Sequence, residues 1–200
     1  MKKPIIAVDI DDVLAAEAAF IVAYSNKHWG HKLAVTDYQE FWEEMWSVDH
    51  EEAERRALEL HQPGIEGSYE PIAGAREALM KLSEKFDLVT VTSRRELVRD
   101  ETLDWLKKHL GDVFSQIIFS GIWDSGKQGA HKLTKTEILQ SVGAEFLIDD
   151  QLKHCNAAAD AGINTVLFGD YPWNQSNSLS EGVTRCASWT KVLEYFDGRS

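Results

Sequence analysis

The stretch Ile5-Ile6-Ala7-Val8-Asp9-Ile10-Asp11-Asp12-Val13-Leu14-Ala15 decides the fold of this 200-residue chain. Its apolar run, residues 5–8, is typical of a strand buried on both faces, and the run stops at Asp9. Because Asp9 and Asp11 are two positions apart where the strand ends, both carboxylates can project into one crevice. The alternative is an acidic turn held by its own side-chain hydrogen bonds.

Four later segments repeat this design of a short apolar run that ends in polar residues. They are residues 88–91, 117–119, 146–148 and 165–168. Helical patterns fill the intervals at residues 74–86, 96–110, 134–142 and 152–161. This alternation predicts an α/β fold, a doubly wound parallel sheet with helices on both faces.

The interval after the first strand is too long for a single crossover. Its helical and aromatic pattern predicts helices at residues 16–28, 36–46 and 51–61. Thr36 and Gln39 have the spacing of a capping box for the middle helix. We therefore predict a core domain of residues 1–14 and 70–200, with a helical cap inserted at residues 15–69.

Composition excludes several classes of function. The chain has 21 Lys and Arg against 33 Asp and Glu, a formal net charge of −12. Such a surface repels polyanions, so neither a nucleic acid polymer nor an anionic membrane is an expected partner. An anionic small substrate would need local cations. Cys155 and Cys186 form no CxxC motif and suit a reducing compartment, and no apolar run reaches membrane-spanning length, so we expect a cytoplasmic protein.

Hydroxyl side chains follow the second predicted strand, at Thr92 and Ser93. Hydroxyl groups at the carboxyl edge of a parallel sheet can hydrogen-bond phosphoryl oxygens. Thr and Ser also end many strands for reasons of turn geometry. Both explanations stay open for this pair.

A lysine near the same edge would supply the local cation, and Lys127, Lys132 and Lys135 are the candidates. Thr134 and Glu137 form a capping-box pattern that places Lys135 at the first helical position. A cation there opposes the helix dipole at a cost of roughly a few tenths of a kcal/mol, which invites a functional explanation. We favour Lys135 and keep Lys132 as the alternative.

Asp149 and Asp150 directly follow a buried apolar run. Adjacent carboxylates at such a position repel each other unless a cation or hydrogen-bond donors hold them. Oxygen ligands of this kind suit Mg²⁺ better than zinc. The pair therefore predicts a magnesium site at the strand end.

The predicted cap carries aromatic residues at helical spacing, among them Phe41, Trp42 and Trp46. Such a stripe is more often packed core than binding surface, although rings facing a cleft can stack on a base. Arg94 follows the hydroxyl pair and is a second candidate for substrate contact. Both assignments remain alternatives to purely structural roles.

Taken in order, these motifs resemble the haloacid dehalogenase superfamily, whose four motifs match Asp9-x-Asp11, Thr92, Lys135 and Asp149-Asp150. Several further stretches resemble its 5′(3′)-deoxyribonucleotidase branch, namely residues 8–15, 71–75, 91–94 and 147–150. One position departs from that branch, which usually has Gly where this chain has Asp12.

The resemblance implies a Mg²⁺-dependent phosphatase that works through an aspartyl-phosphate. In that scheme Asp9 attacks phosphorus, and Asp11 protonates the leaving oxygen and then activates water. The remaining roles implied are phosphate binding by Thr92, Ser93 and Lys135, metal binding by Asp9, the Asp11 carbonyl and Asp149, and support of that site by Asp150.

The expected substrate is a small phosphate ester, and the branch implies (deoxy)nucleoside monophosphates, as in a 5′-nucleotidase. A sugar-phosphate or other small-metabolite phosphatase is the alternative within enzymes. A catalytically silent binding protein of the same fold is the alternative of another class. The sequence leaves the oligomeric state open and is compatible with a homodimer.

Overall fold

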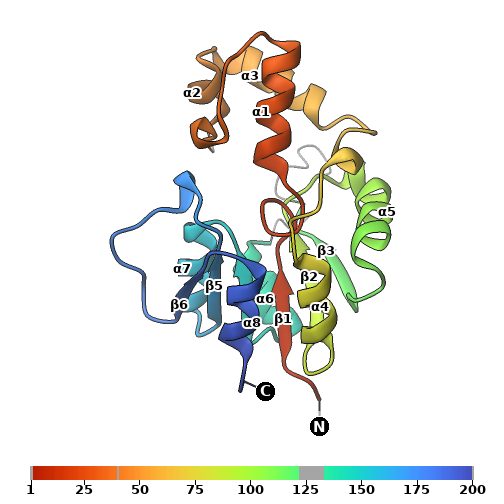
Figure 1. Cartoon of the computed structure of the whole chain (residues 1–200), viewed down its shortest axis with the longest axis vertical. Helices are drawn as coiled ribbons and strands as arrows, with labels where there is room; N and C mark the ends of the chain where they lie inside the picture. Colours follow the sequence, from red (N-terminus) through yellow and green to blue (C-terminus); the bar gives the residue numbers. More distant parts are fainter. Residues whose placement is uncertain (1, 40, 122–132, 200) are drawn as a thin grey trace.

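A computed structural model describes residues 2–39, 41–121 and 133–199. Its centre is one parallel sheet with the strand order β3-β2-β1-β4-β5-β6 (Figure 1). The strands are β1 (Ile5–Val8), β2 (Asp87–Thr92), β3 (Gln116–Phe119), β4 (Phe146–Asp149), β5 (Asn164–Phe168) and β6 (Val183–Cys186). The predicted α/β fold with a doubly wound parallel sheet is confirmed.

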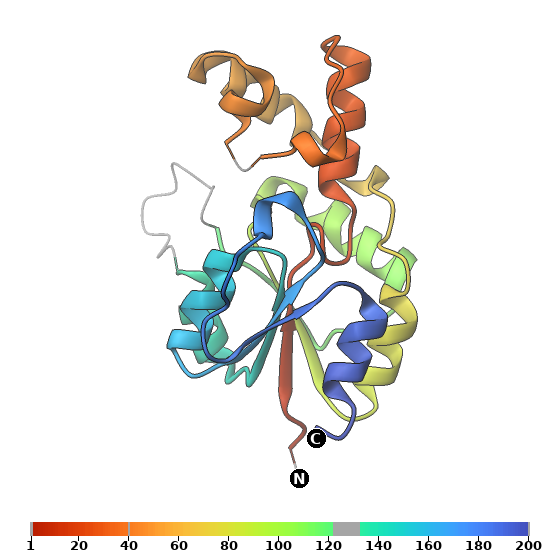
Figure 2. The same cartoon turned by 60° about the vertical axis from the view of Figure 1, so that its left-hand side comes forward.

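Helices cover both faces of this sheet, as Figure 2 shows. One face packs on α4 (Ala75–Ser83), α5 (Arg99–Leu110) and α8 (Trp189–Phe196). The other face packs on α6 (Lys135–Val142) and α7 (Leu152–Asp160). Side chains of β1 alternate between the two cores, with Ile6 and Val8 in the first and Ile5 and Ala7 in the second. Burial on both faces explains why this strand has no polar residue.

The last strand and helix, β6 and α8, were not predicted from the sequence. β6 lies at the sheet edge, where Thr184 is exposed, so it lacks the continuous apolar run of the inner strands. α8 is nevertheless firmly attached, because Trp189 is 1% exposed and its Nε1 donates to the Val13 carbonyl at 3.0 Å.

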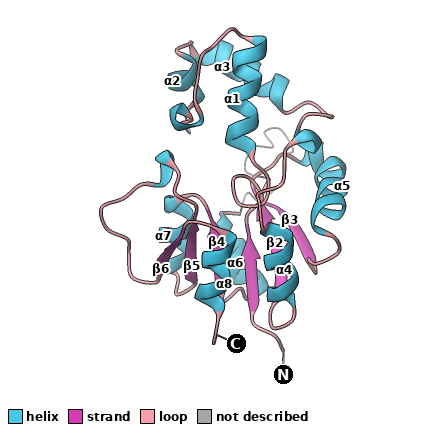
Figure 3. Cartoon of the chain, in the orientation of Figure 1, coloured by secondary structure: helices cyan, strands magenta, loops and turns pink. Residues whose placement is uncertain are grey.

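The inserted residues form α1 (Glu17–His28), α2 (Trp42–Trp46) and α3 (His50–Leu60), which lie beyond the carboxyl ends of the strands (Figure 3). These helices share a hydrophobic cluster of their own. The helix predicted at residues 36–46 is confirmed for its second half, α2, whereas its start is wrong, since Val35–Asp37 form a 3-10 turn. The Asp37 carboxylate accepts the Ala34 N–H at 2.8 Å, and this local bond replaces the capping box expected for Thr36 and Gln39.

Two further sequence predictions concern the cysteines and membrane-spanning segments. Cys155 and Cys186 are both free and buried. Within the described ranges, every helix is too short or too polar to cross a membrane.

Candidate active site

The strand order reverses between β1 and β4, the place where open α/β sheets have a crevice at the carboxyl ends of their strands. Successive strands run outward from β1 in one direction and from β4 in the other, and open α/β sheets bind ligands where the order reverses in this way. Asp9 follows β1 and its N–H donates to the Ile148 carbonyl of β4 at 2.9 Å. Asp149 ends β4, so the two carboxylates meet at this point.

Three buried carboxylates gather there. One oxygen from each of Asp9, Asp149 and Asp150 lies within 4.8 Å of the others. The oxygen-only donor set has the character that Mg²⁺ prefers. The residues present therefore fit the metal that the sequence predicts.

Lys135 supplies the local cation. Its Nζ lies 3.0 Å from Asp9 Oδ1 and 2.6 Å from Asp149 Oδ2, and its side chain is 6% exposed. The predicted capping box is present, since the Glu137 N–H donates to Thr134 Oγ1 and the Glu137 carboxylate accepts the Thr134 N–H. This capping box starts α6 at Lys135, whose side chain reaches Asp9 and Asp149. Lys127 and Lys132 lie outside the described residues.

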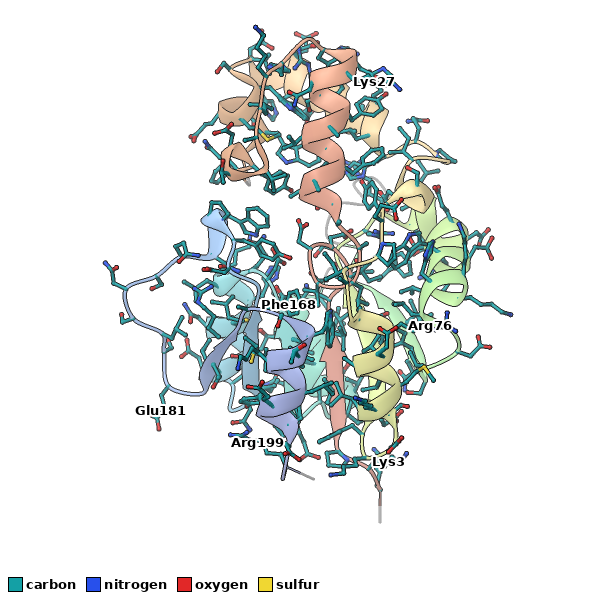
Figure 4. All side chains as sticks on the ribbon, viewed as in Figure 1. Lys3, Lys27, Arg76, Phe168, Glu181 and Arg199 are labelled. Atoms are coloured by element: carbon teal, nitrogen blue, oxygen red, sulfur yellow. The ribbon has the colours of Figure 1, made fainter. Side chains whose placement is uncertain are left out.

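Three labelled surface cations lie away from this edge. In Figure 4, Lys3 and Arg199 lie at the end of the molecule opposite the inserted helices, and Lys27 lies at the far end of α1. Lys135 contacts both Asp9 and Asp149, so it offers its positive charge to an anionic ligand at this place.

The buried carboxylates differ in their ionisation. Burial raises the pKa of Asp9 to about 6, with help from Asp149 and Asp11 and against the effect of Lys135. Burial also acts on Asp149, but Lys135 and His154 hold its pKa well below the usual range. Burial and the neighbouring Asp149 raise the pKa of Asp150 well above its ordinary value. At neutral pH Asp9 and Asp149 are both anionic, and Asp9 retains the charge that a nucleophile needs.

Asp11 points toward a different partner, Arg94. Arg94 Nη2 donates to Asp11 Oδ1 at 2.7 Å, and the Asp11 side chain is 19% exposed. The second carboxylate thus pairs with Arg94 and is not one of the three clustered carboxylates. The structure also turns Arg94, predicted as a substrate contact, toward Asp11.

Thr92 and Ser93 lie at the end of β2, next to β1 in the sheet. Thr92 is fully buried and its Oγ1 accepts the Arg94 N–H at 3.1 Å. Ser93 is half-buried. Both hydroxyl residues reach the predicted edge, and Thr92 also shapes the turn that carries Arg94.

Residues 171–174 hold Asp150, a role that was not predicted. Trp173 Nε1 donates to Asp150 Oδ2 at 2.6 Å, and Asn174 Nδ2 donates to the Asp150 carbonyl at 3.0 Å. Tyr171 stacks on Trp173 with ring centroids 4.5 Å apart. His154, whose Nδ1 lies 3.3 Å from Asp149 Oδ1, was also missed. For residues 171–174 the sequence did offer a signal, because this loop comes shortly after the strand predicted at residues 165–168.

Asp12 connects the site to the first inserted helix. Its carboxylate accepts the Ala18 N–H at 3.1 and 3.2 Å, in the first turn of α1. Ala16 stands at the cap position of that helix and has no side-chain acceptor, so Asp12 takes over the capping role. Asp12 has φ +53°, a conformation that glycine adopts without strain.

The three aromatic candidates occupy different environments. Phe41 is 65% exposed, Trp42 is half-buried and Trp46 is 2% exposed within the cluster of inserted helices. Trp46 Nε1 donates to Ser25 Oγ at 3.0 Å, as expected for a core residue. Tyr38 of the inserted segment contacts the loop that follows β5, with its ring centroid 4.9 Å from that of Trp173.

Two solved structures with a similar fold are described as hydrolases. The haloacid dehalogenase-like family protein SP0104 from Streptococcus pneumoniae aligns with a TM-score of 0.67 and 16% identity, over 97% of this chain and 98% of that one. The "putative HAD-hydrolase YfnB from Bacillus subtilis", solved bound to magnesium, aligns with a TM-score of 0.63 and 17% identity, over 98% and 100% of the chains. The fold class is therefore that of the haloacid dehalogenase-like hydrolases.

The family follows from sequence comparison. A family model described as "5′ nucleotidase, deoxy (Pyrimidine), cytosolic type C protein" matches residues 3–196, and the chain belongs to this family. The chain is also 24% identical over 208 residues to "Putative nucleotidase YqfW" of Bacillus subtilis (strain 168), covering 96% of this chain and 93% of the relative. These findings make the protein a nucleotidase-like hydrolase.

Proposed function

We propose that this protein hydrolyses small phosphate monoesters through an aspartyl-phosphate formed on Asp9. The observation that carries the proposal is the position of Lys135 Nζ, 3.0 Å from Asp9 and 2.6 Å from Asp149. A nucleophilic carboxylate, a fixed cation and a metal-ligating carboxylate thus share one crevice. Phosphoryl transfer needs this combination, since catalysis depends on positioning and on neutralising phosphoryl charge.

The proposed reaction has two steps. Asp9 attacks phosphorus, the bond to the ester oxygen breaks, and Asp11 gives its proton to that oxygen. Asp11 then takes a proton from a water molecule as the water oxygen attacks phosphorus. The bond to Asp9 breaks, which releases phosphate and restores the Asp9 carboxylate. Thr92, Ser93 and Lys135 hold the phosphoryl oxygens.

Magnesium is the proposed cofactor. The Asp9 and Asp149 carboxylates and the Asp11 carbonyl would hold it, with Asp150 supporting the site from its place beside Asp149. When bound, the ion supplies positive charge that offsets the repulsion between substrate and carboxylates. Asp150 is fixed for this role by Trp173 and by Gln151, whose Nε2 donates to Asp150 Oδ2 at 3.0 Å.

For the substrate we propose (deoxy)nucleoside monophosphates, handled by a cap of residues 15–69. Family membership and the relative described as a nucleotidase support this choice. Of the three aromatic candidates, Phe41 and Trp42 have accessible surface for a base, whereas Trp46 is buried. The family description, together with the charge of −12, supports a cytosolic enzyme that binds neither membranes nor nucleic acid polymers.

The test is a phosphatase screen over nucleoside monophosphates, sugar phosphates and p-nitrophenyl phosphate, with Mg²⁺ and with EDTA. We expect Mg²⁺-dependent turnover with nucleotides preferred over ribose 5-phosphate by tenfold or more, since stacking a base is worth about 1–3 kcal/mol. Equal efficiency on sugar phosphates would favour the small-metabolite phosphatase. Binding without turnover would identify a silent binding protein. Sedimentation of the same sample distinguishes a homodimer from a monomer.

A further inference from the structure

The Arg94 side chain is held inside the protein and each of its three nitrogens donates a hydrogen bond. Its side chain is 3% exposed, and charged groups are buried to this extent when they are paired. Besides the bond from Nη2, its Nε lies 3.1 and 3.2 Å from the two Asp11 oxygens. Nη1 donates to Thr102 Oγ1 of α5 at 3.2 Å. The guanidinium therefore faces Asp11 and the protein interior.

The carboxylate of Asp11 depends on this arginine. Within the described part of the chain, each hydrogen bond that the Asp11 carboxylate accepts comes from Arg94. By contrast, Asp12 is held by the Ala18 N–H, and Asp149 is held by Lys135 and the Gln151 N–H. A planar guanidinium that presents two donors to one carboxylate fixes its orientation as well as its charge.

A second buried carboxylate, Glu66, forms an ion pair with the same nitrogen of Arg94. Glu66 Oε2 lies 3.3 Å from Arg94 Nε, and the Glu66 side chain is 2% exposed. Its other oxygen lies 2.9 Å from Nδ1 of His61, which follows α3. The Arg94 guanidinium also lies 5.4 Å from the ring centre of Tyr69. Arg94 is thus held by two carboxylates, Asp11 through hydrogen bonds and Glu66 through an ion pair.

The segment that carries Glu66 is itself anchored to the core. Glu101 of α5 accepts the N–H of Gly64 at 2.8 Å and also the N–H of Gly67. Trp105 Nε1, from the same helix, donates to the Tyr69 carbonyl at 2.8 Å. α5 therefore fixes both Glu66, through these bonds, and Arg94, through Thr102. Such an arrangement is preorganised, because the orientation of Arg94 is set before any ligand arrives.

We propose that Arg94, clamped by Glu66 and Thr102, is the positioning residue for Asp11 and does not itself bind substrate. This inference rests on the proposed function, in which Asp11 gives a proton to the leaving oxygen and takes one from water. Both transfers require the carboxyl group at hydrogen-bond distance from the reacting oxygen. Without Arg94 the Asp11 side chain rotates freely, and both transfers slow down.

The test compares the step that needs Asp11 with one that does not. p-Nitrophenolate leaves without a proton, so Arg94→Met should release one equivalent rapidly from p-nitrophenyl phosphate and then turn over slowly. We expect kcat to fall by about a hundredfold, the lower end of the range for general acid–base catalysis, while kcat/KM for this ester stays within about threefold. For a nucleoside monophosphate, whose alkoxide needs the proton, kcat/KM should fall as well.

The control is Arg99→Met, which removes an arginine of α5 that pairs with Glu96 and should leave all constants unchanged. Arg94→Lys keeps the charge without the two-donor fork, so it should show the same pattern more weakly, and it decides the question if Arg94→Met does not fold. A drop in kcat/KM for p-nitrophenyl phosphate without a burst would overturn the inference, because it means that Arg94 binds substrate. Wild-type kinetics in both Arg94 variants would also overturn it.

The proposed function is checked separately in the same assay. Wild-type protein must turn over p-nitrophenyl phosphate with Mg²⁺, and Asp11→Asn must show the burst followed by a stall. If both hold and only the Arg94 variants deviate from expectation, the inference about Arg94 is wrong and the proposed function stands. If wild-type protein is inactive, the proposed function itself is wrong.

Discussion

Asp12 illustrates how one residue can serve two structural demands that conflict. Its backbone adopts φ +53°, which side chains with a Cβ adopt at a cost, although Asp and Asn tolerate it better than most. Its carboxylate also caps α1 through the Ala18 N–H. The carbonyl of the same residue accepts a hydrogen bond from the Tyr171 hydroxyl at 2.8 Å. Glycine would satisfy only the backbone, so the aspartate has a structural reason to stand in this turn.

Substitutions at Asp12 should separate the two demands. Asp12→Asn keeps an acceptor and tolerates the turn, Asp12→Gly keeps only the turn, and Asp12→Ala keeps neither. We expect stability in urea to decrease in that order, with Ala about 1–2 kcal/mol below Gly because of the left-handed backbone. A stability of Asp12→Ala equal to that of Asp12→Gly would contradict this account of the turn.

Lys135 should matter for folding as well as for chemistry. Lys135→Met leaves Asp9 and Asp149 buried beside each other without their cation, and removing one partner of a buried ion pair costs about 3–5 kcal/mol. The matched control is Lys191→Met, whose partner Glu194 is 57% exposed and whose loss should change stability by less than about 0.5 kcal/mol. Urea unfolding in EDTA measures both. Similar values for the two variants would refute the ion-pair argument.

At the scale of elements, the aromatic residues at α2 have different environments. Trp46 lies in the core, Trp42 is half-buried and Phe41 lies on the surface. Trp46→Ala should cost about 3–5 kcal/mol and lower activity on every substrate, because it opens a cavity among the inserted helices. Phe41→Ala should leave the melting temperature unchanged, since that side chain is 65% exposed. Thermal unfolding and turnover of nucleotides and p-nitrophenyl phosphate measure both. A stable Trp46→Ala protein would contradict the packing described for this cluster.

The elements that sequence analysis predicted are those with strong local signals. β1, β4 and β5 are buried on both faces, so their continuous apolar runs stand out, and α6 begins at a capping box that the structure confirms. The box expected at Thr36 did not form, and the Asp37 carboxylate accepts the Ala34 N–H there instead. β6 was missed because its edge position allows polar residues.

The candidate site was predictable where its residues end strands and unpredictable where they come from loops. Asp9, Thr92 and Asp149 follow or end apolar runs, and a parallel sheet brings such positions to one edge. Glu66 and Trp173 reach the site through the paths of long connections, which no short-range pattern encodes. The position of Arg94 was evident, but its partner was not, because Asp11 lies 83 residues away along the chain.

At the scale of the whole molecule, the net charge is −12 and three carboxylates cluster at the strand ends. We therefore expect a bound cation to stabilise the folded protein. An ion that binds only the folded state stabilises it by about 2.7 kcal/mol at a hundred times its dissociation constant. Mg²⁺ should therefore raise the melting temperature of EDTA-treated protein. Ca²⁺ should raise it too without supporting turnover, since its larger and looser coordination misplaces the reacting groups.

The matched control for this metal effect is Asp149→Asn, which should lose most of the thermal shift. Calorimetry with and without each ion measures it. An unchanged melting temperature in saturating Mg²⁺, or full activity in EDTA, would contradict the assignment of this cluster as a metal site.

The central claim is that Asp9 carries the phosphoryl group, and the most direct test is to trap it there. Asp11→Asn protein is mixed with p-nitrophenyl phosphate and Mg²⁺, quenched in acid within the first turnover and digested for peptide mass spectrometry. The account predicts one phosphoryl group on the peptide with residues 5–15, located at Asp9 and missing in the Asp9→Asn, Asp11→Asn double variant. A phosphoryl group on another residue, or active wild-type protein whose Asp11→Asn variant never becomes phosphorylated, would contradict it.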